Sequence, residues 1–258
     1  MSVLEVRGLS KSFGGVEAVG DVSFDLGKGE FLALIGPNGA GKTTCFNMLN
    51  GYLRPDRGSV KLAGRELVGL RPRRIVRLGV GRTFQITRTF LSMTVRENVQ
   101  MALIAHHRGM YDLWRRATRL HVAEAEALLD LVSMRDQAGR ACSELAYGDL
   151  KRLELAIALA HDPALLLMDE PTAGMAPSER VALMQLTADI VAERGVSVLF
   201  TEHDMDVVFA HAHRILVLNR GRLIAEGTGA EIRANALVQE VYLGGGTLYE
   251  AEKEAGDA

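Results

Sequence analysis

Short stretches of alternating or continuous apolar residues dominate the first part of the chain. Residues 3–6 and 22–26 alternate between apolar and polar side chains, whereas residues 31–35 form a continuous apolar run. Alternation is typical of a strand with one buried face, and a short continuous run is typical of a strand buried on both faces. Gly36 ends the last of these stretches. The N-terminal part is therefore predicted to be rich in β-structure.

Helical periodicity replaces this pattern from Thr94 onward. Thr94 and Glu97 have the spacing of a capping box, and apolar residues follow at helical intervals. Residues 121–134 place apolar side chains on one helical face, and residues 148–161 form a further helical segment that Pro163 ends. The middle of the chain is therefore predicted to be helical.

Strand-like apolar runs return at residues 165–168, 196–200 and 215–218, with a helical stretch at residues 178–194. A strand, a helix and a second strand in this order imply a parallel sheet. The predicted fold class is therefore α/β, with a helical insertion in the core. The predicted division is a core of residues 1–85 and 164–243, an insertion of residues 86–163 and a flexible tail of residues 244–258.

Composition and charge exclude several classes of protein. The chain has 258 residues, 48% of them hydrophobic, with 30 Lys+Arg against 32 Asp+Glu and a net charge of -2. These proportions exclude disordered, collagen-like and coiled-coil proteins, and they give no general attraction to nucleic acid. Its two cysteines, Cys45 and Cys142, indicate a reducing compartment. No apolar run approaches the roughly 20 residues of a membrane helix, so if the protein works at a membrane, something else must hold it there.

Residues 36–43 read G-P-N-G-A-G-K-T and match the phosphate-binding loop G-x-x-x-x-G-K-[ST]. The match lies between a predicted strand and a predicted helix, which is the context that the mechanism requires. Glycines let consecutive N–H groups point at phosphate oxygens, and Lys42 adds a positive charge. Thr43 can offer its hydroxyl to Mg²⁺. The loop predicts nucleotide binding; an accidental glycine-rich turn is the alternative.

Two carboxylates, Asp169 and Glu170, follow the apolar run at residues 165–168. Ligands of parallel sheets bind at the carboxyl ends of the strands, where the phosphate loop also lies. Asp169 therefore suits Mg²⁺, and Glu170 suits a base that activates water. His203 follows the next strand in the same way and could reach a γ-phosphate. Taken alone, His203 and Gln85 are compatible with a structural role, and Asp169-Glu170 with an ordinary turn.

The order of these motifs resembles that of ATP-binding cassette (ABC) ATPase subunits over almost the whole chain. The phosphate loop, Gln85, a signature-like L-A-Y-G-D at residues 145–149, the Asp169-Glu170 pair and His203 occur in the family's order and spacing. The resemblance implies a P-loop nucleotide-binding core with a mostly parallel sheet, an N-terminal antiparallel β part and an inserted helical subdomain. It also implies ATP hydrolysis with Mg²⁺, in which Thr43, Gln85 and Asp169 serve the metal.

The resemblance also assigns roles to individual residues. Lys42, Gln85, Glu170 and His203 are implied to be catalytic, and the family's adenine-stacking aromatic falls on Phe13; the alternative for Phe13 is a core position. The implied nucleotide-binding residues are Phe13, Val16, Ala18, Gly36, Pro37, Asn38, Gly39, Ala40, Gly41, Lys42, Thr43, Thr44, Tyr147 and Gly148.

The chain departs from the family pattern in the signature that acts on the nucleotide of the opposite subunit. The usual form is LSGGQ, but Ala146 has no hydroxyl, Tyr147 replaces the first glycine and Asp149 replaces the glutamine. Ala176 stands where an aspartate usually communicates across the dimer. Only Gly148 and the helix N-terminus behind it match the usual pattern. A homodimer of this chain is therefore expected to be a weak ATPase.

An L-A-Y-G signature resembles the subgroup that energises branched-chain amino-acid importers, as do residues 81–85, 93–99 and 241–244. The implied partners are transmembrane permease subunits, a second and preferably different ATP-binding subunit, and indirectly an extracytoplasmic solute-binding protein. The implied location is peripheral, at the cytoplasmic face of the cell membrane. Alternatives are the ATPase of a lipopolysaccharide-type exporter, a soluble ABC protein without a transporter and a regulatory binder that does not hydrolyse ATP.

Other features are predicted to be structural. The arginines at residues 71–77 have no interleaved aromatic residues, which favours a solvated helix face over nucleic-acid binding. The pairs His106-His107 and His211/His213 are interpreted as surface or helix-end residues, because no carboxylate or cysteine lies at ligand spacing along the sequence. Cys45, just after the phosphate loop, is expected to pack in the core.

Overall fold

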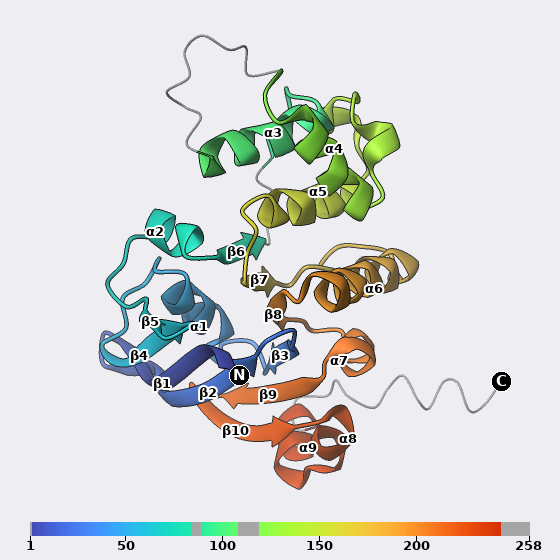
Figure 1. Ribbon diagram of the computed structural model, residues 1–258. Coiled ribbons are helices and arrows are strands. Elements are labelled where there is room, and N and C mark those ends of the chain that lie inside the picture. The colour runs from blue at the N-terminus through green and yellow to red at the C-terminus, as the bar shows by residue number, and fades with distance from the viewer. Residues whose placement is uncertain (1, 84–88, 108–118, 244–258) are drawn as a thin grey trace, which may run out of the picture.

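The computed structural model describes residues 2–83, 89–107 and 119–243. Two sheets form its framework (Figure 1). The antiparallel sheet has the order β2-β1-β4-β5, with β1 (Ser2–Phe13), β2 (Val16–Gly27), β4 (Arg57–Leu62) and β5 (Arg65–Glu66). The second sheet has the order β10-β9-β3-β8-β7-β6, with β3 (Phe31–Ile35), β6 (Val80–Thr83), β7 (Leu165–Asp169), β8 (Ser197–Thr201), β9 (Arg214–Asn219) and β10 (Arg222–Gly227).

The second sheet is parallel except at one edge. Strands β3, β6, β7, β8 and β9 pair in parallel, and β10 pairs antiparallel with β9. The prediction of a mostly parallel sheet with an antiparallel N-terminal part is therefore confirmed. The apolar run at residues 31–35 is strand β3 over its whole length, as predicted.

The parallel sheet separates two hydrophobic cores. In β3, Phe31, Ala33 and Ile35 join the core on one face, whereas Leu32 and Leu34 join the core on the other. This division follows from the period of two in a strand, and it explains why the run is continuously apolar. Each fully buried side chain of this size stabilises the fold by roughly 1.5 to 3 kcal/mol.

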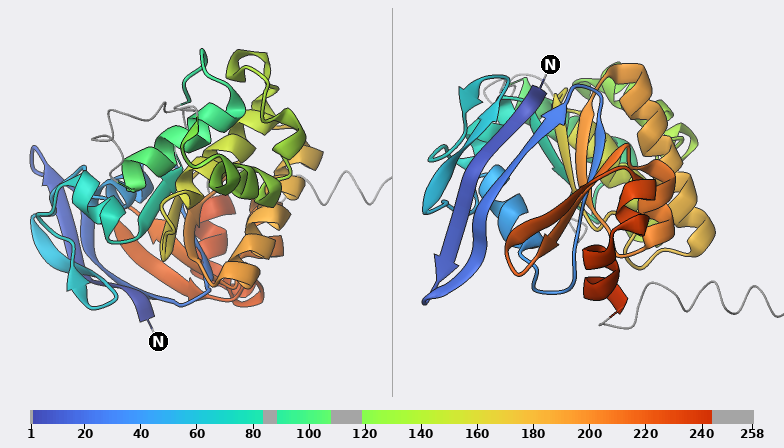
Figure 2. Two further views of the ribbon diagram at one scale, coloured as in Figure 1. Left: turned by 45° about the horizontal axis from the view of Figure 1, so that its top comes forward. Right: turned by 90° about the horizontal axis from the view of Figure 1, so that it is seen from below.

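Helix α1 (Lys42–Leu49) lies between the sheets (Figures 1 and 2). It contributes Cys45, Phe46 and Leu49 to the core that it shares with the antiparallel sheet. The opposite face of the parallel sheet packs against α5 (Tyr147–Leu159), α6 (Pro177–Arg194) and α7 (Met205–His211). The remaining helices are α2 (Pro72–Arg77), α3 (Val95–His106), α4 (Val122–Leu131), α8 (Gly229–Ala234) and α9 (Ala236–Leu243). Of these, α3 and α4 form a layer over α5 (Figures 1 and 2).

Helices α3, α4 and α5 follow β6 and precede β7 in the chain, as the predicted insertion requires. The capping box at the start of α3 is confirmed, because Glu97 N–H donates to Thr94 Oγ1 at 3.2 Å and Thr94 N–H donates to Glu97 Oε2 at 2.8 Å. Helix α4 ends three residues earlier than predicted, since Ser133 has a φ of 56°. The predicted start of the insertion at residue 86 and the predicted tail at 244–258 lie outside the described residues.

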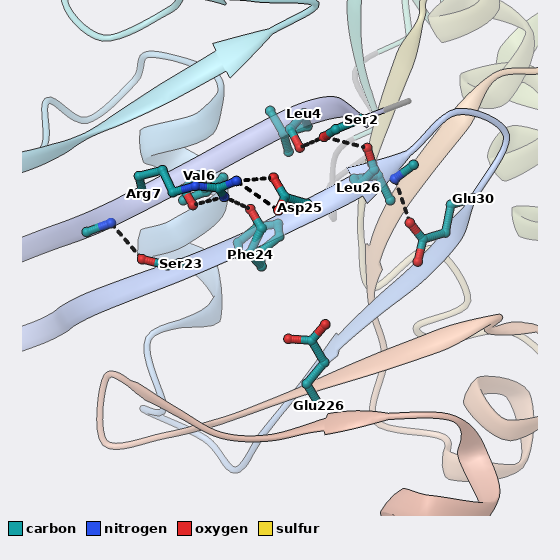
Figure 3. A network of polar contacts seen from close by, with 12 residues as sticks. Ser2, Leu4, Val6, Arg7, Ser23, Phe24, Asp25, Leu26, Glu30 and Glu226 are labelled. Atoms are coloured by element: carbon teal, nitrogen blue, oxygen red, sulfur yellow. Dashed lines mark hydrogen bonds and ion pairs between the residues drawn. The ribbon is translucent and has the colours of Figure 1, made fainter.

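Polar contacts tie the long strands β1 and β2 together (Figure 3). Arg7 donates from Nη2 to both oxygens of Asp25, at 2.7 and 2.8 Å, and from Nη1 to the carbonyl of Phe24 at 3.1 Å. Gly27 N–H donates to Glu30 Oε2 at 2.6 Å in the connection to β3. Glu30 Oε1 accepts from Arg214 Nε of β9 at 2.7 Å, so this carboxylate links both sheets.

The arginines of residues 71–77 are exposed on and beside α2, as predicted, while Ile75 is buried. None of the described helices is long and apolar enough to cross a membrane. Four of the described strands, β4, β5, β6 and β10, did not follow from the apolar pattern.

Candidate active site

The phosphate loop connects the end of β3 to the start of α1, as predicted. Gly41, the residue before α1, has a φ of 107°, and a Cβ there would lie 2.5 Å from the carbonyl oxygen of Ala18. Glycine is therefore required on both conformational and steric grounds. The first N–H groups of α1 have no partner inside the helix, so they are available to an anion held in the loop.

Lys42 is buried, and its ammonium group is held by the loop itself. Nζ donates to the carbonyl of Gly36 at 2.6 Å and to that of Pro37 at 3.2 Å. Burial lowers the pKa of Lys42, although the carboxylates of Glu170 and Asp169 oppose this shift. A phosphate in the loop would supply the negative charge that favours the ammonium form. Thr43, the next residue, is exposed.

Asp169 lies at the end of β7 and is held from both neighbouring strands. Its Oδ1 accepts from Thr201 Oγ1 of β8 at 3.0 Å, and its Oδ2 accepts from Arg82 Nη2 of β6 at 3.2 Å. Arg82 also donates to Asn47 Oδ1 of α1 at 3.0 Å. The nearly buried carboxylate is thus fixed in position beside the helix that follows the phosphate loop.

Glu170 and His203 contact each other, as expected for residues that follow adjacent parallel strands. Glu170 Oε1 lies 2.8 Å from His203 Nε2. The backbone of Glu170 has a φ of 49°, a left-handed conformation that is uncommon outside glycine, and its N–H donates to the carbonyl of Thr201 at 3.1 Å. Strained positions of this kind cluster at functional sites. His203 is half exposed, so the pair faces solvent.

Glu202 is a further acidic residue that the sequence did not single out. It is 5% exposed, and its Oε1 accepts from the backbone N–H of Thr172 at 2.8 Å and from Thr172 Oγ1 at 2.7 Å. Burial raises the pKa of Glu202, and these hydrogen bonds offset part of the shift. Glu202 therefore holds the loop after Glu170 next to His203.

A pocket of about 410 Å³ lies beside the first turn of α1. Its lining residues are Phe13, Thr43, Thr44, Asn47, Tyr52, Leu53 and Arg82. The Phe13 side chain is 49% exposed, so it is not a core residue. Val16 is paired with Phe13 across the β1–β2 turn and is exposed, and Ala18 is half-buried. The pocket thus joins the predicted base-stacking residue to the predicted magnesium ligand Thr43.

The remaining predicted residues occupy other places. Loop residues 37–40 line a second pocket of about 560 Å³ together with the β9–β10 turn and α9. Tyr147 and Gly148 begin α5, and within the described part of the chain neither is hydrogen-bonded to the phosphate loop. Gln85 lies outside the described residues.

The start of α5 packs against the start of α6. A Cβ on Gly148 would lie 3.0 Å from Glu179 Oε1, and a Cβ on Gly174 would lie 3.4 Å from the Tyr147 ring. Ala146, the N-cap of α5, makes no side-chain hydrogen bond. Ala176 caps α6, and only its backbone N–H pairs with Glu179, at 3.2 Å. Both helices therefore begin at an alanine that cannot cap through its side chain.

Both cysteines are buried, as expected for Cys45. Burial raises the pKa of the Cys45 thiol to about 12. Burial also raises the pKa of Cys142, with a smaller contribution from Glu97, and Cys142 Sγ accepts from Asn98 Nδ2 at 3.1 Å. Neither thiol is therefore poised for nucleophilic chemistry.

Residues 19–173, more than half of the chain, match the family model described as ABC transporter. The chain belongs to the ABC transporter family. Residues 222–247 of this ABC transporter chain match a second model, described as Branched-chain amino acid ATP-binding cassette transporter. As an ATP-binding cassette of this family, the chain is an ATPase that binds nucleotide, which confirms the resemblance found in the sequence.

Relatives of this ABC transporter chain align over nearly its whole length. The High-affinity branched-chain amino acid transport ATP-binding protein LivG of Salmonella typhimurium is 42% identical over 252 residues, which are 94% of this chain and 98% of LivG. BraF of Pseudomonas aeruginosa, which bears the same description, is 40% identical with the same coverage. A crystal structure of an ABC transporter cassette in its ADP conformation has a TM-score of 0.85 and 30% identity, covering 95% of this chain and 99% of that one.

Proposed function

We propose that this chain is the ATP-hydrolysing subunit of an importer for branched-chain or related amino acids. The observation that carries the proposal is the convergence of Lys42, Asp169, Glu170 and His203 at the carboxyl ends of the adjacent strands β3, β8 and β7. The names of LivG and BraF and the model matched by residues 222–247 support the class of solute.

The donor atoms of the site fit ATP with Mg²⁺, whose preferred ligands are hard oxygens. Thr43 offers an exposed hydroxyl and Asp169 a carboxylate that two hydrogen bonds already orient. Gln85 is a proposed third contact. Mg²⁺ supplies charge neutralisation on the phosphates when it is bound. In the structure Arg82 forms an ion pair with Asp169. When the metal is bound, the Asp169 carboxylate would interact with both Arg82 and the metal.

In the proposed mechanism, Lys42 exchanges its bonds to the Gly36 and Pro37 carbonyls for bonds to phosphate oxygens. Phe13 stacks on the adenine, with Val16 and Ala18 beside it. Glu170 accepts a proton from the attacking water. His203 is hydrogen-bonded to the Glu170 carboxylate in the structure, and it would donate a hydrogen bond to the γ-phosphate once ATP is bound. These groups act mainly by placement and electrostatics, because phosphoryl transfer has a loose transition state.

The proposed partners are transmembrane permease subunits and a second, different cassette, and indirectly an extracytoplasmic solute-binding protein. The proposed location is the cytoplasmic face of the membrane, and the proposed insertion of residues 86–163 would contact the permeases. Tyr147 and Gly148 would face the partner cassette's nucleotide. A lipopolysaccharide-type exporter ATPase and a soluble ABC protein remain as alternatives, but residues 222–247 favour the importer.

The test is reconstitution of the chain with its permease subunits and second cassette in vesicles, with the solute-binding protein supplied on the opposite side. We expect ATP-dependent accumulation of radiolabelled leucine, with lysine as the control solute. ATP hydrolysis that is stimulated by a lipid substrate and not by leucine would instead support the exporter.

A further inference from the structure

Two histidines and a glutamate converge at the junction of α3 and α4, away from the nucleotide site. His107 caps the C-terminus of α3, and His121 precedes the first residue of α4. Glu124, in the first turn of α4, brings Oε2 to 3.0 Å from His107 Nε2 and Oε1 to 2.9 Å from His121 Nδ1. The two imidazole rings are stacked, with centroids 4.6 Å apart and an angle of 10° between their planes.

From the sequence, His107 is interpreted as a surface or helix-end residue because no carboxylate lies at ligand spacing along the sequence, but in the structure Glu124 lies within ligand reach of it. The expectation considered spacing along the chain, whereas Glu124 is 17 residues from His107 and approaches it across two packed helices. The placement of His106 and His107 at a helix end is confirmed.

We propose that His107, His121 and Glu124 form a binding site for a first-row divalent cation, with Zn²⁺ as the best match. Two imidazole nitrogens and a carboxylate oxygen are the ligand set of open zinc sites, in which water takes the fourth position. Ligand atoms about 2.0–2.2 Å from a tetrahedral ion lie roughly 3.3–3.6 Å apart. The observed separations of 2.9 and 3.0 Å are hydrogen-bond lengths and are slightly shorter than this range, and all three ligand atoms lie within 4.8 Å of one another.

The packing of α3 against α4 preorganises the three side chains. Gln100 of α3 donates to the carbonyl of Leu120, the residue before His121. Arg96 of α3 donates to Glu126 of α4 at 3.3 Å. These contacts fix the start of α4 beside α3 without using any of the three ligands, so an ion would bind by rotation of the stacked imidazole rings and without movement of the two helices.

Neighbouring imidazoles complete the surroundings of the site. The His106 ring lies edge-on to His107, with centroids 5.0 Å apart, and 5.5 Å from the ring of His161, which follows α5. A bound ion would tie the end of α3 to the start of α4, in the same helical layer that carries Tyr147 and Gly148. The site would therefore stiffen that layer without contacting Lys42 or Asp169.

The experiment titrates the purified full-length chain with Zn²⁺ by calorimetry and with Co²⁺ by visible absorption, both in excess Mg²⁺ to occupy the oxygen ligands of the nucleotide site. We expect one ion per chain and a Co²⁺ spectrum of a four-coordinate site. Glu124→Gln and, separately, His121→Asn should each weaken binding by roughly 100-fold, since even partners outside a ligand set are worth about 10- to 100-fold.

Two controls separate this site from others. His211→Asn changes a histidine of α7, and Asp169→Asn removes a carboxylate of the nucleotide site; neither should change the Co²⁺ spectrum. Zn²⁺ should raise the melting temperature of the wild type and of both controls, but not that of the Glu124 and His121 variants. Unchanged binding in both ligand variants, or loss of the ion in the Asp169 variant, would overturn the proposal and leave a hydrogen-bonded His–Glu–His cluster.

Discussion

Around the phosphate loop, every implied side chain within the described residues carries the expected chemical group, from the ammonium of Lys42 to the Glu170–His203 pair. At the start of α5, Ala146 offers no hydroxyl, and the half-exposed Tyr147 lies where a glycine is usual. On the proposed roles of these residues, we infer that the chain is better equipped to hydrolyse its own nucleotide than to complete a partner's site. The difference favours pairing with a second cassette whose signature is closer to the usual form.

The largest expected effect is that of Glu170→Gln, which keeps the size of the side chain but removes the proposed base. Hydrolysis in the assembled complex should fall by roughly 100-fold or more, while ATP binding is retained. Steady-state phosphate release and a nucleotide-binding assay measure the two quantities. Glu193→Gln, at an exposed carboxylate of α6, serves as the matched control. Near-normal turnover of the Glu170 variant would exclude Glu170 as the base.

Phe13→Ala should come next, because it removes the proposed stack on the adenine. ATP affinity should weaken by roughly 1 to 3 kcal/mol, or about 5- to 150-fold in Kd, with a smaller change in turnover of bound ATP. Val181→Ala, at an exposed apolar position of α6, is the control. If calorimetry gives the wild-type Kd for the Phe13 variant, the adenine stacks elsewhere.

Ala146→Ser tests the signature at the start of α5, because it restores the hydroxyl that the usual signature carries. In a homodimer, turnover should rise by roughly tenfold, since a hydrogen bond to a charged group is worth about 1.5 kcal/mol or more. Ala210→Ser, at an exposed position of α7, should leave turnover unchanged. If the wild-type homodimer hydrolysed ATP as fast as the complete transporter, the signature would not limit the ATP turnover of this chain.

The smallest expected effect concerns Glu202 and the pH dependence of stability. Burial raises the pKa of Glu202 above its ordinary value of 4.5, so its contribution to stability is fully present below that value and is lost as pH rises through the raised pKa. Glu202→Gln mimics the protonated form at every pH. Its melting temperature relative to wild type should therefore increase from pH 5 to pH 8, by calorimetry. A difference that stays constant would show that Glu202 does not titrate in this window.

Local sequence patterns predicted the elements that depend only on their own residues. The strand at residues 31–35 is buried on both faces and reads as continuously apolar, and the α3 capping box involves only Thr94 and Glu97. By contrast, β6 (Val80–Thr83) holds one bulky apolar residue and lies at the edge of its sheet, so its sequence carries little strand pattern.

The active-site residues that could be predicted from the sequence are those that belong to contiguous motifs. Loop residues 36–43 and the Asp169-Glu170 pair are such motifs, and the structure places them at the carboxyl ends of β3 and β7, the two strands on either side of β8. Arg82, Thr201 and Glu202 were missed because their roles depend on the strand order β8-β7-β6 and on a loop returning to β8. The His107–Glu124 contact was missed for the same reason, since it forms between two helices.

The burial of both cysteines has a practical consequence for fluorescence experiments. Because Cys45 and Cys142 are the only two thiols in the sequence and both are buried with raised pKa values, maleimide dyes should leave the folded wild-type chain unlabelled. A cysteine introduced at an exposed position such as Val181 of α6, paired with a second at Met101 of α3, would then carry the dyes selectively. Energy transfer between the two dyes would then report the distance between α3 and α6 during the ATP cycle, without removal of the native cysteines.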